Sequence, residues 1–196
     1  MLSSRRSVLM QAATSLAVSS AAPGALAVSS AAPGALAAAG RAAPLSPDAQ
    51  REVQEVLQRA TLGHVALMRG DLAGYREALQ ISDDFTLMSP FGGQPTHVSS
   101  LTEERWQGVA AFFKGGRDST VELLQAYHSL EMITLMLREH THVAVGAVPA
   151  QHWSLRVTLV FTRQAGAWKL AHRHADPLVA GISVEQAARL AGPVVA

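Results

Sequence analysis

Apolar and polar side chains alternate with period two through most of the second half of the chain, from about residue 120 onward. Such alternation is typical of β-strands with one buried face, and the alternating stretches are rich in β-branched and aromatic residues. Turn signals divide the pattern into separate strands. The predicted strands cover residues 120–127, 132–145, 152–163 and 168–175.

Apolar residues in the first half recur at helical spacing instead, as Val53, Val56 and Ala60 do. Ser46 and Asp71 precede two of these stretches and are good candidates for helix N-caps. The predicted helices cover residues 48–68, 71–79, 101–113 and 184–190, with a short strand at residues 85–88. Helices followed by an antiparallel meander predict an α+β domain whose helices lie on one face of the sheet.

One face of the predicted strand at residues 152–163 is strongly apolar, and the other is polar. The apolar face carries Trp153, Leu155, Val157, Leu159 and Phe161. A sheet covered by helices on one side only should not expose so many large apolar groups on its other side. We therefore expect a second subunit to cover an apolar outer face, although the pattern leaves open which alternation faces the helices.

The main candidate chemistry lies in residues 168–177. Read with period two, Trp168, Leu170, His172 and His174 share one face, which begins apolar and ends in two imidazoles. A strand that reaches from the core into a pocket would show this order. His174 and His172 are therefore candidates for a base, a hydrogen-bond donor or a ligand, unless both are structural and bonded to neighbouring groups.

Two stretches near the C-terminus carry a resemblance to a known family. Residues 156–163 (Arg-Val-Thr-Leu-Val-Phe-Thr-Arg) and residues 166–174, with Gly-x-Trp and His-x-His, resemble the closing strands of the nuclear transport factor 2-like superfamily, in its SnoaL-like and ketosteroid-isomerase-like branch. The resemblance covers roughly residues 50–180. It implies a cone-shaped cavity between N-terminal helices and a curved antiparallel sheet, a small apolar molecule in that cavity, and a homodimer formed through the outer sheet face.

The same resemblance implies cofactor-free acid–base chemistry on an apolar substrate, such as isomerisation, dehydration or cyclisation. Ketosteroid isomerase uses an Asp base and an oxyanion hole made by Tyr and a protonated Asp. The candidate catalytic residues here are His174, His172, Arg156, Asp84 and Tyr75, but no acid stands where the second Asp is expected. Arg156, in the middle of a strand, either clamps a substrate carboxylate or enolate or pairs with a nearby acid.

A second His-x-His pair, His140 and His142, raises the question of a metal site. Two such pairs would bind zinc only if they faced each other on neighbouring strands. The family does not usually hold a metal there. We therefore expect neither a metal nor a cofactor.

The first 37 residues have a different character from the rest. Residues 4–9, Ser-Arg-Arg-Ser-Val-Leu, resemble a twin-arginine export signal, and an exact ten-residue repeat follows at residues 16–25 and 26–35. Small residues predict signal cleavage near Ala27 or Ala37, and Pro and Gly in the repeat argue against a stable membrane anchor. We expect a periplasmic or secreted protein with a signal peptide at residues 1–37, a linker at 38–47 and a SnoaL-like domain at 48–196.

The charge balance narrows the class of partner. The chain has 16 basic and 15 acidic residues and no cysteine. Removal of residues 1–37 takes away two basic residues and no acidic ones, which leaves a net charge of about −1 and no basic stripe for nucleic acid. Two function classes remain: a small-molecule pocket, with or without catalysis, and a non-catalytic envelope protein that mediates dimerisation or assembly.

Overall fold

The computed structural model of the chain describes residues 45–192. The expected signal peptide, tandem repeat and cleavage sites lie outside these residues. The helices are α1 (Pro47–Met68), α2 (Leu72–Leu79), α3 (Glu103–Phe112) and α4 (Val184–Leu190), with one 3-10 turn, η1 (Val98–Ser100). The strands are β1 (Ile81–Met88), β2 (Thr96–His97), β3 (Phe113–His128), β4 (Met132–Val145), β5 (Val148–Gln164) and β6 (Ala167–Pro177).

The helix boundaries follow from local capping. The side chain of Ser46 accepts a hydrogen bond from the backbone N–H of Ala49 at 3.2 Å, and Asp71 accepts one from Gly74 at 2.9 Å. Both residues thus satisfy a backbone donor that the first helical turn leaves free. The expected N-caps of α1 and α2 are confirmed. The strand β4 has the predicted bounds, and β1, β3, β5 and β6 are longer than the alternation predicted.

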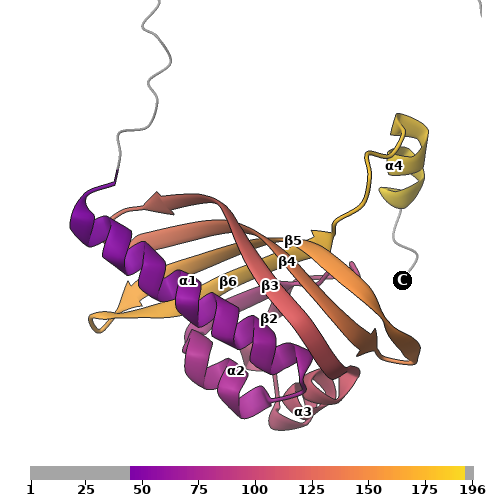
Figure 1. Ribbon diagram of the computed structural model, residues 1–196, viewed down its shortest axis with the longest axis horizontal. Helices are drawn as coiled ribbons and strands as arrows, with labels where there is room; N and C mark the ends of the chain where they lie inside the picture. Colours follow the sequence, from indigo (N-terminus) through magenta and orange to yellow (C-terminus); the bar gives the residue numbers. More distant parts are fainter. Residues whose placement is uncertain (1–44, 193–196) are drawn as a thin grey trace, which may run out of the picture. The chain divides into compact units, whose positions relative to one another are not determined.

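The strands form one curved sheet in the order β2-β1-β6-β5-β4-β3 (Figure 1). Neighbours from β3 to β6 are antiparallel, as the meander predicted. The pairing of β1 with β6 is parallel, which the sequence did not indicate. The chain leaves β1, crosses through α3 to the far edge at β3, and returns strand by strand until β6 meets β1 in the same direction.

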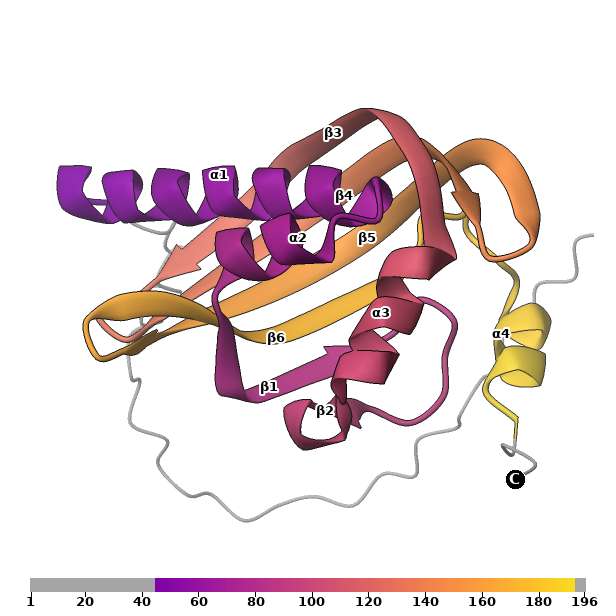
Figure 2. The same ribbon diagram turned by 90° about the horizontal axis from the view of Figure 1, so that it is seen from below.

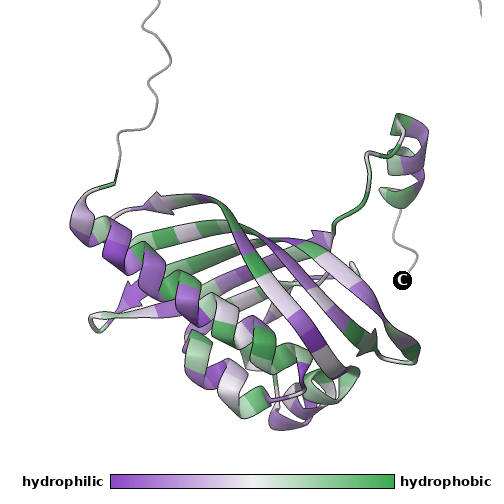
Figure 3. Cartoon of the chain, viewed as in Figure 1, coloured by the Kyte–Doolittle hydropathy of each residue, from purple (hydrophilic) through white to green (hydrophobic). Residues whose placement is uncertain are grey.

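Helices α1, α2 and α3 cover one face of this sheet, called the inner face below (Figure 2). The helix α1 lies along β3 and β4, and hydrophobic residues alternate with hydrophilic ones along the strands (Figure 3). Val56 of α1 and Ile133 of β4 are fully buried between the two layers. The expected α+β arrangement, with helices on one side of an antiparallel-dominated sheet, is confirmed. Among residues 45–192, no helix is long and apolar enough to cross a membrane.

The apolar face of β5 turns out to be the inner one. Leu155, Val157, Leu159 and Phe161 are between 0% and 3% exposed, buried under the helices of their own chain, and Trp153 is partly buried on the same side. The expectation that a second subunit covers these side chains is therefore wrong. The core of a single chain already buries them.

The strand β6 changes face partway along its length. Its pairing with β5 shifts between Phe161, opposite Leu170, and Val160, opposite His172, so that Ala171 is an extra residue. A β-bulge of this kind reverses the alternation beyond it. Trp168 and Leu170 point inward before the bulge, and Arg173 and Ala175 point inward after it.

The predicted shared face of His172 and His174 with Trp168 and Leu170 is consequently wrong. The two histidines lie on the outer face, with His174 exposed and His172 half-buried. Arg173, assigned by strict alternation to the polar side, is 9% exposed and lies in the interior.

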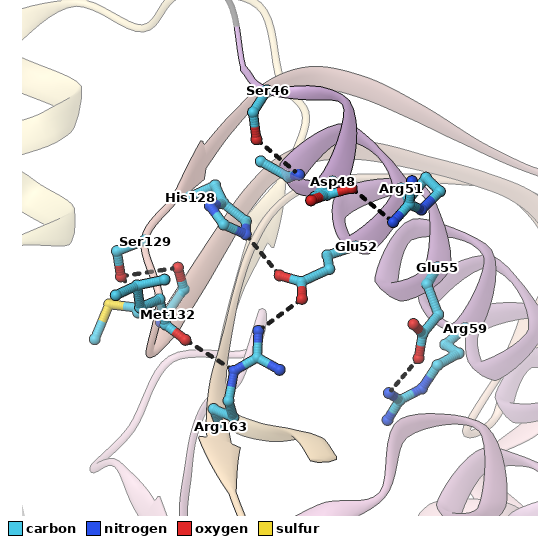
Figure 4. A network of polar contacts seen from close by, with 12 residues as sticks. Ser46, Asp48, Arg51, Glu52, Glu55, Arg59, His128, Ser129, Met132 and Arg163 are labelled. Atoms are coloured by element: carbon cyan, nitrogen blue, oxygen red, sulfur yellow. Dashed lines mark hydrogen bonds and ion pairs between the residues drawn. The ribbon is translucent and has the colours of Figure 1, made fainter. Parts of the chain in front are cut away.

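A polar network attaches the N-terminal half of α1 to the sheet (Figure 4). The Glu52 carboxylate accepts hydrogen bonds from His128 on β3 at 2.7 Å and from Arg163 on β5 at 2.8 Å. These two hydrogen bonds lower the pKa of Glu52. The Arg163 guanidinium also stacks over the Trp168 ring at 4.1 Å. The network therefore links α1 to β3 and β5 at this end of the domain.

Candidate ligand-binding site

A cavity of about 530 Å³ opens at the end of the domain that holds α3. Its volume lies within the range typical of small-molecule sites. It lies between the last turn of α1, the helix α3, the second half of β1, and the inner face of β5 and β6. The apolar lining side chains are Leu67, Met68, Phe85, Leu87, Pro90, Phe91, Leu101, Trp106, Val109, Phe112, Phe113 and Leu155.

Two polar side chains, Tyr75 from α2 and Arg173 from β6, close the inner end of this cavity. We call them the polar end. Tyr75 is 5% exposed and Arg173 is 9% exposed. Both also border a small void of about 10 Å³ that His64 and Glu139 line from behind. The polar end therefore borders a buried charged cluster, of which Arg173 is itself a member.

The buried cluster is held by a two-armed ion pair. Arg173 donates from Nη1 to Oε1 of Glu139 at 2.9 Å and from Nη2 to Oε2 at 2.7 Å. The Nδ1 atom of His64, on the buried side of α1, lies 3.2 Å from the same Oε2 atom. One carboxylate thus ties α1, β4 and β6 together beneath the cavity.

The charges of the pair stabilise each other against burial. Burial alone would raise the pKa of Glu139, but the Arg173 charge and then His64 outweigh it and hold that pKa well below its usual range. Burial likewise would lower the pKa of Arg173, and Glu139 overcomes this effect and raises it. Burial raises the pKa of the Tyr75 hydroxyl, which keeps its proton at neutral pH. The polar end presents a guanidinium and a protonated phenol.

Of the five candidate residues, Tyr75 lies at this cavity and the other four do not. Arg156 and Asp176 form an ion pair on the outer face at 2.6 Å, with 62% of the Arg156 side chain exposed. Pairing with a nearby acid was one of the two alternatives for Arg156. Asp84 is exposed on β1 and accepts a hydrogen bond from Ser82 at 2.6 Å.

The outer-face histidines have local partners. The Nδ1 atom of His172 lies 2.7 Å from the Thr86 hydroxyl, and burial, followed by the nearby His174, lowers the pKa of His172. Strand β5 separates this pair from His140 and His142, so the two His-x-His motifs do not meet. Within residues 45–192 no group of three or more His, Asp or Glu side chains is arranged to hold a metal ion.

Sequence reasoning missed Glu139, His64 and Arg173. A signal for the first two was present. Glu139 continues the buried alternation of Leu135 and Leu137 on β4, and His64 follows Ala60 and Val56 along the buried stripe of α1. A charged group in such a position must be paired. Arg173 carried no such signal, because unbroken alternation places it on the outer face and only the bulge at Ala171 turns it inward.

The mouth of the cavity is bordered by the loop between β1 and β2. Phe91 of this loop stacks on Trp153, with ring centroids 5.8 Å apart, and meets the edge of Phe112 at 5.3 Å. Gly92 and Gly93 follow with φ values of +75° and +86°, which favour glycine. Phe91 is one of the residues that line the cavity, so this loop forms part of the cavity wall.

Comparisons with known proteins agree with this architecture. A family model described as a SnoaL-like domain matches residues 56–180. A solved structure of a candidate dehydratase of the nuclear transport factor 2-like family, from Streptomyces avermitilis, is similar with a TM-score of 0.54 at 16% identity, over 67% of this chain and 99% of that chain. A ketosteroid isomerase-like protein from Erwinia carotovora atroseptica gives 0.52 at 15% identity, over 66% and 98%.

A third solved structure, a nuclear transport factor 2-like protein of unknown function from Pseudomonas putida, gives a TM-score of 0.51 at 19% identity over 73% of this chain and 94% of that chain. At such identities the likeness shows the fold alone. The predicted nuclear transport factor 2-like fold is thereby confirmed. None of the curated proteins compared with the chain matches it.

The buried pair generates a prediction about acid stability. Because the folded pKa of Glu139 is depressed, its stabilisation is present above the ordinary value of 4.5 and is lost as the pH falls below that value, where the unfolded chain takes up the proton first. Urea unfolding of the natural protein should show a free energy of unfolding that drops in this range. The double variant Glu139→Leu/Arg173→Met, which removes both charges, should lose stability less steeply.

The matched control is Glu122→Gln, which removes the exposed carboxylate of the Glu122–Arg138 pair. It should leave the acid sensitivity unchanged. The same pH slope in the double variant and in the natural protein would show that Glu139 is not the group responsible.

Proposed function

The chain belongs to the SnoaL-like family, and from that membership we propose that its domain binds a small, largely apolar molecule in the cavity at α3. The apolar walls favour such a ligand because they remove its surface from water. A few polar groups at one end of an apolar pocket commonly set the orientation of a ligand. Tyr75 and Arg173 have this arrangement.

The presence of both Tyr75 and Arg173 in the lining of the cavity, and of the small void behind it, is the observation that carries the proposal. Both groups can donate hydrogen bonds to a carbonyl oxygen or to an oxyanion that forms on it. Cofactor-free isomerisation, dehydration or cyclisation requires stabilisation of this kind. A catalytic role would make Tyr75 the proton donor and Arg173 the partner that stabilises negative charge.

Binding is nevertheless better supported than turnover. Among the described residues that line the cavity there is no Asp, Glu or His to act as a base. Glu139 is held by Arg173, and His174, His172 and Asp84 lie elsewhere. We therefore propose ligand binding as the function, with acid–base catalysis as its extension where the substrate or a water molecule supplies the base.

The experiment compares a variant whose new side chain fills the cavity with a control variant on the outer face. We expect the neutral fluorescent probe N-phenyl-1-naphthylamine to bind the natural protein. Val109→Trp, which adds a ring at the lining, should weaken that binding by about tenfold or more, because the new ring takes the space of the probe. His174→Ala, on the outer face, should leave it unchanged. Equal binding by both variants would place the probe outside the cavity.

We also propose that the protein is a homodimer through its outer sheet face. The support is a set of large apolar side chains on that face, where Tyr127, Met132 and Met136 are 58%, 46% and 40% exposed. Neighbouring apolar groups exposed on a sheet are often covered by a partner. This is the specific observation for the second candidate function, in which the domain mediates assembly of an envelope protein.

Charge introduced into the outer face should separate the subunits. We expect Met136→Asp to change the sedimentation of the protein from dimer to monomer, because a carboxylate is costly in a buried interface. Leu130→Asp is the control, since Leu130 is 80% exposed in the turn between β3 and β4 and lies outside the face. A natural protein that sediments as a monomer would rule out this dimer.

We further propose that the protein is exported to the periplasm or secreted by the twin-arginine route. The support is the Ser-Arg-Arg motif and the small residues before Ala27 and Ala37. Replacement of Arg5 and Arg6 by Lys should retain the precursor inside the cell, as measured by the intact mass in each fraction. Continued appearance of a cleaved form outside the cytoplasm would contradict this route.

A further inference from the structure

Two arginine side chains line the cavity, and none of the described acidic side chains does. Arg173 lies at its inner end and Arg105, on α3, lies along its wall, and no described Asp or Glu lines it. Glu139 offsets the charge of Arg173 from behind, so the remaining positive charge comes from Arg105. A ligand with a negatively charged group is therefore favoured over one with a positive group.

The hydrogen-bonding capacity of Arg173 is only partly used. Its two Nη atoms hold Glu139, and none of the described groups accepts from its Nε atom. Within residues 45–192, the fully enclosed side-chain nitrogens without a partner belong to His64, His142, Trp153 and Trp168. The Nε atom of Arg173, on a residue that lines the cavity, is therefore not sealed in. One edge of the guanidinium remains available for a second planar acceptor.

Tyr75 adds a second donor at the same place. Arg173 can only donate, and the Tyr75 hydroxyl, which burial keeps protonated well above neutral pH, can donate as well as accept. A carboxylate has two oxygens and can only accept, so it satisfies both groups. A primary amide of the same shape offers Arg173 one neutral oxygen, whereas a carboxylate offers two charged oxygens, and hydrogen bonds between ionised groups are roughly twice as strong as neutral ones. The end of the cavity thus discriminates between groups of equal size.

The position of Arg173 is also fixed before any ligand arrives. The two hydrogen bonds to Glu139 and the contact of Glu139 with His64 set the plane of the guanidinium. A donor that is already oriented loses little conformational entropy on binding, which favours a ligand of matching geometry. The rings of Phe85, Trp106 and Phe113 surround the remaining volume and suit an apolar body.

We propose that the ligands of this cavity are apolar monocarboxylates, whose carboxylate binds the free edge of Arg173 and the Tyr75 hydroxyl. The inference rests on the proposed ligand-binding function and narrows it to one chemical class. Glu139 is the positioning residue, since it acts through Arg173 and does not touch the ligand.

The test compares two probes of nearly equal shape, 1-naphthoate and 1-naphthamide, as competitors of N-phenyl-1-naphthylamine on the full chain. We expect naphthoate to displace the fluorescent probe at a concentration about tenfold or more below that of naphthamide, because only the carboxylate forms charge-assisted hydrogen bonds with Arg173. Equal displacement, with the fluorescent probe still bound, would overturn the carboxylate class and leave the ligand-binding function standing.

Two double variants test whether the preference for naphthoate over naphthamide depends on Arg173. Glu139→Leu/Arg173→Met removes both buried charges together, which avoids leaving one of them unpaired, and it should abolish the preference for naphthoate while the neutral probe still binds. Arg156→Met/Asp176→Leu makes the same exchange in the outer-face pair and should preserve the preference. A preference that survives the first exchange, or vanishes with the second, would overturn the assignment to Arg173.

Failure of the neutral probe itself to bind the natural protein would have a different meaning. It would contradict the proposed function, and the carboxylate inference would fall with it. The fluorescent signal and the competition ratio therefore report on the two proposals separately.

Discussion

The buried ion pair between Arg173 and Glu139 is the constraint on which the rest of the domain depends. Each charge is almost completely removed from water, and removal of one partner from such a pair costs about 3–5 kcal/mol. The pair links β6 to β4 across β5, and His64 brings α1 to the same carboxylate. Two strands, one helix and the inner end of the cavity thus meet at one group of atoms.

The bulge at Ala171 makes this pair possible. With strict alternation Arg173 would face outward and two imidazoles would enter the apolar core. One extra residue in β6 instead delivers a guanidinium to the inner face and leaves His172 beside Thr86 on the outer face. The cost is a local break in the ladder, which the two charged hydrogen bonds to Glu139 offset. The identity of the polar end follows from this one irregularity.

The order of helices and strands could be predicted because hydrophobic spacing and capping residues such as Ser46 act locally. The bulge in β6 could not be predicted from the sequence, since residues 168–175 fit an unbroken alternation equally well. The parallel pairing of β1 with β6 was also not predicted, because it depends on where the last strand of the meander lies relative to β1. Tyr75 came from family resemblance, whereas Glu139 could have been found as an acid within a buried alternation on β4.

The face assignment of β6 is the central claim, and cysteine labelling tests it most directly. The chain contains no cysteine, so single substitutions at 170, 172, 174 and 175 can be labelled in the folded protein with a thiol reagent. A bulged strand predicts faster labelling at 172 and 174 than at 170 and 175, which should be protected. Protection at 170, 172 and 174 with labelling at 175 would mean an unbroken alternation, and would contradict the account.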